Sequence, residues 1–200
     1  MRWFDRHPLA LGAYALAALL ALFELAMLWQ ALNPDVPDTY RAYYIDHSTT
    51  CLPQPVTGAY RLGTLVDFRS GGDETRELRP CGWDGPAGDG VHSIGERSQL
   101  QFHVGEPLDL TLALELTAVT LPGPDRQHVL VSADGQPLGE LVVTPGQTGQ
   151  FALDIPATAV DQSGRLTITL DYPDAISPGP RTANTHWRAI KLSAARLAPR

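Results

Sequence analysis

A tryptophan in a glycine-rich stretch is followed by acidic and imidazole side chains that could bind a ligand. Trp83 comes directly after Gly82, and the polar side chains Asp84, Asp89 and His92 follow shortly after it. An exposed aromatic ring can stack on the C–H face of a sugar, while carboxylates and imidazole bond its hydroxyl groups. These four side chains are therefore candidate glycan-binding residues. The alternative is structural: the loop folds back over the edge of a domain, and Trp83 fills a gap there as an apolar plug.

Other side chains with catalytic potential do not form a catalytic pattern. His47 and Ser48 are adjacent, but a serine hydrolase needs its nucleophile on a strained turn, typically in G-x-S-x-G, which the sequence lacks. It also lacks HExxH and a close histidine pair, either of which would indicate zinc. Asp73, Glu74 and Glu77 are expected in a solvated loop, with a structural calcium site as the alternative. We therefore expect no catalytic residues, no metal and no cofactor.

The chain has two cysteines, Cys51 and Cys81. Outside the cytoplasm such a pair is usually oxidised, and closing the loop between them would stabilise a domain by roughly 3–4 kcal/mol. The alternative is a metal or redox pair, but the spacing is not C-x-x-C and no His/Cys cluster lies nearby. The sequence therefore predicts a structural Cys51–Cys81 disulfide, which would tie the segment before the domain to the Gly82–Trp83 turn.

One long apolar run stands near the N-terminus. Pro8–Leu32 holds 25 residues with a single charged side chain, Glu24. A hydrocarbon core of roughly 30 Å needs about 20 helical residues, so this run is long enough to span a bilayer. The alternative is a cleaved signal peptide, whose apolar core is about 7–15 residues long and ends at a small-x-small site. This run is longer and ends in MLWQALNPD, a poor cleavage site, so a retained transmembrane anchor is expected.

The charges that flank the run predict its orientation. Arg2 and Arg6 precede it, whereas Asp35 and Asp38 follow it. By the positive-inside rule, the N-terminus lies in the cytoplasm and the rest of the chain lies outside.

Glu24 interrupts the apolar run. A carboxylate in the hydrocarbon core costs roughly 3 kcal/mol, so such residues usually face a partner helix or a polar pocket. One hypothesis is that Glu24 docks this helix on a multi-span membrane protein. The alternative is a protonated or snorkelling glutamate in a tolerant single span.

Strand patterns follow the anchor at regular spacing. Leucines at every second position of Leu108–Leu116 alternate with small or polar residues. This period of two predicts a strand with one buried face and one solvent-exposed face. Val129–Ala133 and Gln136–Val143 flank Asp134-Gly135, which supplies the positive φ angles of a two-residue hairpin turn. Further strands are expected over Tyr60–Phe68, Gln99–Val104, Phe151–Ile155, Leu166–Tyr172 and Trp187–Leu197. The glycine-rich stretch Arg69–Gly95 is expected to be a long loop.

About eight short, half-buried strands in one domain predict an all-β fold class. The expected architecture is a jelly-roll-like antiparallel two-sheet sandwich preceded by one N-terminal transmembrane helix. The expected organisation is a cytoplasmic tail over 1–7, the anchor over 8–32, a stalk over 33–57 and an extracytoplasmic domain over 58–200. The net charge of −7 argues against nucleic-acid binding, which needs a basic patch.

Several segments follow one order along the chain: GAYRLGTLVDFRSGG, CGWDGPAGDGVHSIGERSQLQF, VLVSADGQPLGELVV, FALDIP, LTITLDYPDAISP and RAIKLSAARL. In this order, over residues 58–197, they resemble the jelly-roll, carbohydrate-binding-like domain appended to some bacterial membrane glycosyltransferases and phosphoglycerol transferases. That domain has a Gly-Trp pair, then an acidic residue, then a second tryptophan. Gly82 and Trp83 match the pair, Asp89 stands for the acidic residue, and His92 replaces the second tryptophan. The catalytic membrane domain that usually accompanies it is not found in this sequence.

The resemblance implies a membrane-anchored, non-catalytic accessory subunit. It would bind glycan, or support a glycan-synthesis or transfer enzyme, at the outer face of the bacterial cytoplasmic membrane. The expected partners are a multi-span membrane glycosyltransferase or related envelope protein, and glycan; the C-terminal domain is expected in the periplasm. One alternative is a structural or assembly protein of an envelope complex without sugar contact. The other is a polysaccharide-modifying enzyme, such as an esterase or lyase.

Overall fold

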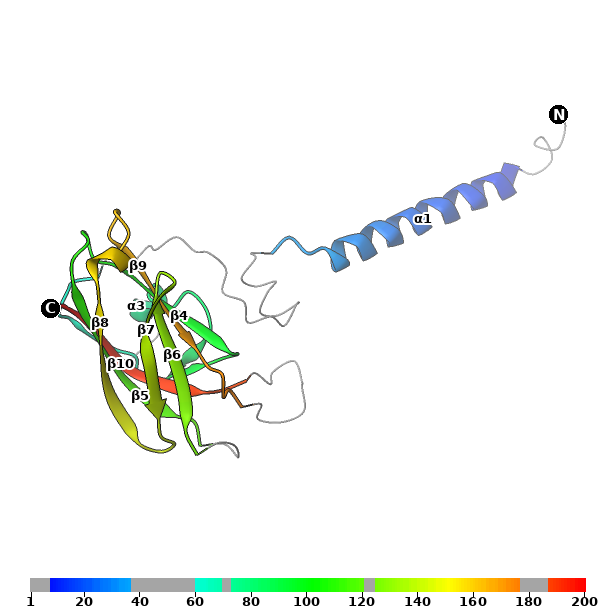
Figure 1. Ribbon diagram of the computed structural model, residues 1–200. Coiled ribbons are helices and arrows are strands. Elements are labelled where there is room, and N and C mark those ends of the chain that lie inside the picture. Colours follow the sequence, from blue (N-terminus) through cyan, green and yellow to red (C-terminus); the bar gives the residue numbers. More distant parts are fainter. Residues whose placement is uncertain (1–7, 37–59, 70–72, 121–124, 177–186) are drawn as a thin grey trace. The chain divides into compact units, whose positions relative to one another are not determined.

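The computed structural model describes residues 8–36, 60–69, 73–120, 125–176 and 187–200. Met1–Arg41 and Ala42–Arg200 form two compact units, and each is described by itself. The first unit contains a long helix and the second a β domain (Figure 1). Most of the predicted stalk, 33–57, lies outside the described residues.

Helix α1 (Pro8–Leu32) covers the whole apolar run. Leucine and alanine, which dominate it, are strong helix formers. The helix ends where the Asn33 side chain donates a hydrogen bond to the Trp29 carbonyl at 3.1 Å, just before Pro34, which cannot continue a helix. Among the described residues, this helix is the one long and apolar enough to cross a membrane, over Ala10–Leu32. The expected N-terminal apolar helix of spanning length is confirmed, whereas its insertion and orientation stay predictions.

Six strands form the larger sheet, in the order β2–β3–β10–β5–β8, with β1 also paired to β10. Every pairing within it is antiparallel. Its strands are β1 (Leu65–Asp67), β2 (Trp83–Ala87), β3 (Gly90–Ser93), β5 (Leu110–Ala118), β8 (Thr148–Ile155) and β10 (Ile190–Pro199). β1 is thus shorter than the strand predicted over Tyr60–Phe68.

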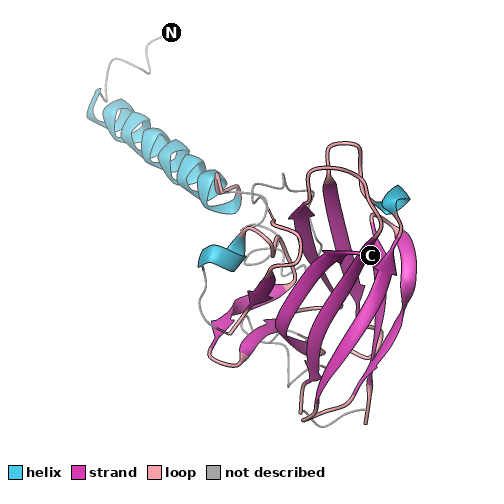
Figure 2. Cartoon of the chain, turned by 90° about the vertical axis from the view of Figure 1, so that its left-hand side faces the viewer, coloured by secondary structure: helices cyan, strands magenta, loops and turns pink. Residues whose placement is uncertain are grey.

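Four strands form the second sheet, in the order β4–β9–β6–β7, again with antiparallel pairing. They are β4 (Arg97–His103), β6 (Gln127–Ala133), β7 (Gln136–Val143) and β9 (Arg165–Asp171). Two short turns of helix, α3 (Asp73–Arg76) and η3 (Ala157–Ala159), lie in the connections. The strands gather into two layers (Figure 2). The predicted all-β, jelly-roll-like two-sheet sandwich is confirmed.

The core lies between the sheets and follows from the alternation seen in the sequence. Leu110, Leu112, Leu114 and Leu116 of β5 are at most 2% exposed, while the residues between them point to the other face. Burying one such leucine contributes roughly 1.5–3 kcal/mol. The second sheet supplies the facing half of the core, and its fully buried side chains include Leu100, Phe102, Leu166, Ile168 and Leu170.

The predicted Asp-Gly hairpin is confirmed. Ala133 pairs with Gln136 across the turn, and Asp134 and Gly135 have φ angles of 44° and 82°. Aspartate and glycine tolerate this left-handed region better than most residues, so this pair sets the β6–β7 register.

The prediction of one long loop over Arg69–Gly95 is wrong, because β2 and β3 form a hairpin within it. Ala87 pairs with Gly90 at its tip. Gly90 has a φ of 130°, and a Cβ there would lie 2.5 Å from the carbonyl oxygen of Leu192 on β10. Glycine is therefore needed where the hairpin meets β10. Short strands that contain glycine and proline lack the period-two pattern, which is why the sequence did not indicate them.

Strand β10 lies at the centre of the larger sheet. β5 pairs along one of its edges, whereas β3 and β1 share the other: Leu192 pairs with Val91 of β3, and Ala194 with Asp67 of β1. The register against β5 shifts between Leu192 and Ala194, so Ser193 is a bulge. β10 thus brings three strands from distant parts of the chain to one sheet.

Candidate functional site

Trp83 is the first residue of β2 and is buried. It is 9% exposed, and its indole Nε1 donates a hydrogen bond to the carbonyl oxygen of Gln99 on β4 at 2.7 Å. Gly82 turns the chain with a φ of 76°, and a Cβ there would lie 2.2 Å from the carbonyl oxygen of Arg97. The ring therefore joins the end strands of the two sheets. This is the packing of an apolar plug, and it leaves little ring surface for stacking on a sugar.

Asp84 follows in β2 and is held from two directions. Arg188 Nη2 donates to its Oδ2 at 2.6 Å, and Arg79 Nη1 donates to its carbonyl oxygen at 3.1 Å. Burial would raise the pKa of this carboxyl, but hydrogen bonds from Arg188 and from the Gly85 N–H outweigh it and hold the pKa below its usual value. The ionised Asp84 thus ties β2 to the segment that leads into β10.

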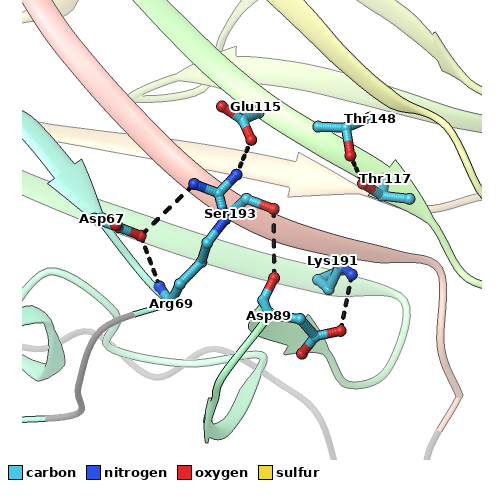
Figure 3. Close-up of polar contacts among 8 residues, drawn as sticks. All are labelled: Asp67, Arg69, Asp89, Glu115, Thr117, Thr148, Lys191 and Ser193. Atoms are coloured by element: carbon cyan, nitrogen blue, oxygen red, sulfur yellow. Dashed lines mark hydrogen bonds and ion pairs between the residues drawn. The ribbon is translucent and has the colours of Figure 1, made fainter.

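Asp89 and His92 meet Lys191 of β10. Lys191 Nζ donates to Asp89 Oδ2 at 2.8 Å, and Ser193 Oγ lies 3.5 Å from the Asp89 carbonyl oxygen (Figure 3). His92 pairs with Lys191 across the sheet, and its Nε2 is 3.8 Å from Asp89 Oδ1. The hydrogen bond from Lys191 lowers the pKa of Asp89, whereas burial is the main cause that lowers the pKa of His92. His92 is therefore mainly a neutral imidazole near pH 7, which can donate one hydrogen bond and accept another.

The side of the larger sheet that points away from the core, here called the outer face, carries side chains in cross-strand rows. Strand register defines three of them. The polar row is His92, Lys191, Thr117 and Thr148; the charged row is Asp67, Ala194, Glu115 and Gln150; the alanine row is Leu65, Arg196, Ala113 and Ala152. Each row crosses four strands, so the outer face offers one continuous surface.

Arg69 lies over the charged row and connects its carboxylates (Figure 3). Its guanidinium contacts Glu115, and its Nη1 lies 4.0 Å from Asp67 Oδ1. The backbone N–H of Arg69 also donates to Asp67 Oδ1 at 2.9 Å. In the polar row, the hydroxyls of Thr117 and Thr148 lie 2.9 Å apart. Hydroxyl, carboxylate, guanidinium, ammonium and imidazole groups therefore lie together on this face.

Three of the four candidate residues come together, and the fourth packs into the core. The charges of Asp84 and Asp89 both act on His92. Their cationic partners, Arg188 and Lys191, were not among the candidates, because they come from the other end of the chain. Nothing in the sequence indicates that β10 pairs with β3. Glu115 could have been found, because it lies between Leu114 and Leu116 in the alternating run and must therefore point away from the core.

Of the two cysteines, Cys81 lies within the described residues. The backbone of Cys81 pairs with that of Gln99 as a single antiparallel β-bridge, and the Cys81 Sγ lies 3.5 Å from Gln99 Oε1. Cys51, His47 and Ser48 lie outside the described residues, so the Cys51–Cys81 disulfide stays a prediction. Over the described parts of the chain, no group of three or more His, Cys, Asp or Glu side chains could hold a metal ion.

Glu24 lies at the end of a row of alanines on α1. Residues three or four positions apart share a helix face. Ala13, Ala17 and Ala21 form such a row, and the side chains three or four positions from Glu24 are Leu20, Ala21, Met27 and Leu28. Small residues let membrane helices approach closely, and polar side chains can bond across the contact. The Glu24 side chain is exposed in the described chain. Its role in docking stays a prediction.

No protein-family model matches the sequence, and no curated protein matches it. Among solved structures, the CBM22-1 xylan-binding domain of Paenibacillus barcinonensis Xyn10C is similar over 72% of this chain and 99% of its own length, with 11% identity and a TM-score of 0.44. The carbohydrate-binding module CBM36, in complex with calcium and xylotriose, is similar over 68% and 99%, with 10% identity and a TM-score of 0.38.

A glycoside hydrolase family 43 arabinoxylan arabinofuranohydrolase from Bacillus subtilis is similar over 72% of this chain, with 13% identity and a TM-score of 0.41. The chain spans 28% of the length of that hydrolase. Several of these structures are carbohydrate-binding modules, the class of domain that the sequence order resembles. At such identities and TM-scores, neither a ligand nor a binding site transfers to this chain.

Proposed function

We propose that this chain is a membrane-anchored, non-catalytic accessory subunit that binds glycan on the outer face of its larger sheet. The observation that carries the proposal is the set of polar groups aligned across that face. In the polar row, His92, Lys191, Thr117 and Thr148 follow one another across four strands. Hydroxyl, imidazole and ammonium groups complement sugar hydroxyls, which both donate and accept hydrogen bonds.

The proposed place of action is the outer side of the bacterial cytoplasmic membrane. Support comes from the apolar helix α1 and from the charge difference between its flanks. In this proposal, Glu24 and the row Ala13, Ala17 and Ala21 that leads to it dock α1 against a multi-span membrane glycosyltransferase or related envelope protein. The accessory subunit would then hold glycan close to the enzyme that makes or transfers it.

A second candidate function is an envelope scaffold without sugar contact. The burial of Trp83 favours it, because the glycine-rich segment then lacks the exposed aromatic ring that sugar-binding surfaces commonly use. The two candidates differ in one measurable property, since a scaffold needs its partner but binds no glycan.

The test is a glycan array probed with the full chain in lipid nanodiscs, which avoids competition from sugar-based detergents. His92→Ala and Thr148→Val change the two ends of the polar row. Each is expected to weaken binding roughly fivefold, the effect of losing one hydrogen bond of about 1 kcal/mol. Thr169→Val on β9, on the outer side of the other sheet, is the matched control and should bind as the wild type does.

Each outcome has a distinct meaning. Wild-type protein that retains no glycan would leave the scaffold as the remaining candidate. Glycan binding that His92→Ala and Thr148→Val leave unchanged would move the site away from the polar row without removing the function.

A further inference from the structure

The charged side chains of the outer face pair with one another, with one exception. Its carboxylates each contact a cation: Asp67 and Glu115 contact Arg69, Asp89 contacts Lys191, and Asp154 contacts Arg200. Arg196 of β10 is exposed, and within the described residues no ion pair or hydrogen bond satisfies its side chain. Its guanidinium is thus the unmatched charge of the three rows.

Small side chains surround this guanidinium. The neighbours of Arg196 on the same side of β10 are Ala194 and Ala198, and Ala113 lies across from it on β5. On the other edge Arg196 pairs with Leu65 of β1, which is 62% exposed. Methyl groups rise little above a sheet, so a ligand can reach the guanidinium from the side. Leu65 adds apolar surface against which the C–H groups of a sugar ring can pack.

We propose that Arg196 and the alanine row recognise an acidic sugar, whose carboxylate pairs with the guanidinium. The inference rests on the proposed glycan-binding function and adds the class of ligand. Arginine presents a rigid, planar fork of N–H donors that fits both oxygens of a carboxylate. The neighbouring charged row does not cancel this charge, because Glu115 and Asp67 already contact Arg69.

Because the chain carries a net negative charge, a preference for acidic over neutral glycan must come from individual contacts with the ligand. A net charge of −7 does not attract a polyanion from a distance, so preference for an acidic glycan has to arise at a contact such as Arg196. Removing this one guanidinium should therefore remove the preference.

The experiment uses the full chain in lipid nanodiscs and two ligands that differ at the carboxyl group alone: oligogalacturonate and its uncharged methyl ester. The wild type is expected to bind the acid roughly tenfold more tightly, since a hydrogen bond to a charged group is worth about that factor or more. Arg196→Gln should bind both forms alike, and Arg196→Lys should keep part of the preference. Arg126→Gln, which removes an exposed arginine ahead of β6, should keep all of it.

The outcomes separate this inference from the proposed function. Equal binding of acidic and neutral glycans by the wild type, or a preference that survives in Arg196→Gln, overturns the inference and leaves glycan binding intact. If the wild type binds no glycan on the array, both the proposed glycan-binding function and this inference are contradicted. Because Arg196 is exposed, unchanged melting of Arg196→Gln will show that a lost preference does not come from unfolding.

Discussion

Trp83 illustrates, at the scale of a residue, how burial separates two uses of the same ring. A stacking tryptophan would contribute affinity and little stability, whereas a buried one contributes to the fold. At 9% exposure, with its N–H bonded to Gln99, Trp83 belongs to the buried kind.

Replacing Trp83 with alanine should therefore destabilise the domain. The cavity and the lost contacts are expected to lower the free energy of unfolding by about 3–5 kcal/mol, and the melting temperature by on the order of 10 °C. Thermal melts of the full chain measure this. Leu130→Ala, which truncates a 45% exposed side chain of the second sheet, is the control and should melt near the wild type. An unchanged melt for Trp83→Ala together with lost glycan binding would restore the stacking role.

Asp84 predicts a pH dependence. Its pKa in the folded state lies below the unfolded value of about 3.9, so the folded state binds fewer protons. The stabilisation is thus complete above roughly pH 5 and is lost as the pH falls through the folded pKa. Asp84→Asn should lower the melting temperature at neutral pH, and the gap to the wild type should close in acid. Asp125→Asn, an exposed carboxylate ahead of β6, should show no such gap, and a gap for Asp84→Asn that persists in acid would contradict the assignment.

At the scale of an element, the sequence predicted strands with regular alternation and missed those without it. β5 and the Asp134-Gly135 hairpin could be predicted because side-chain period and turn chemistry both act locally. β2 and β3 could not, since the Gly90 contact with Leu192 exists only once β10 lies beside them. The ion pair between Arg188 and Asp84 could not be predicted for the same reason, since it forms only when the segment before β10 lies beside β2.

Helix α1 carries a prediction of its own. Glu24→Leu should leave membrane insertion intact, because it removes a charge from the span, but should reduce co-purification of a membrane partner. Glu24→Gln tests the bond rather than the charge, since an amide can still bridge helices. If Glu24→Leu leaves recovery of the partner unchanged, Glu24 has no docking role and is a glutamate tolerated in a lipid-facing helix.

The second element-scale prediction concerns the connection between the stalk and β2. A Cys51–Cys81 disulfide is expected in protein recovered from the cell envelope, and mass spectrometry of unreduced peptides would detect it. Its removal by Cys51→Ser should cost roughly 3–4 kcal/mol of stability. Detection of two free thiols would rule it out.

At the scale of the whole molecule, we predict the orientation of the chain in the membrane, with the C-terminus outside the cytoplasm. With the N-terminus in the cytoplasm, a phosphatase fused to the C-terminus should be active, because that enzyme matures only outside. A green fluorescent protein exported unfolded through the same route should stay dark. The reverse pattern would place the β domain in the cytoplasm and remove the basis of the proposed partners.

The class of the fold could be predicted from the sequence, but which residues lie next to one another on its surface could not. Alternation in single strands predicts which residues face away from the core, yet not which strands are neighbours. The alanine row combines Leu65, Arg196, Ala113 and Ala152 from four strands, so it exists only in the assembled sheet. Residues that act together here are distant in the chain.

Strand β10 comes last in the chain and lies in the middle of the larger sheet. β1 pairs with no other strand of that sheet, and β5 has only β8 until β10 joins it. In the proposed topology, translocation from the N-terminal anchor would deliver β10 after the other strands, so the domain could close only once β10 has crossed the membrane. Pairing over such sequence distances is slow. A chain stalled before β10 would present an open edge of β5 to its neighbours, so in this topology β10 would also protect the chain from aggregation during export.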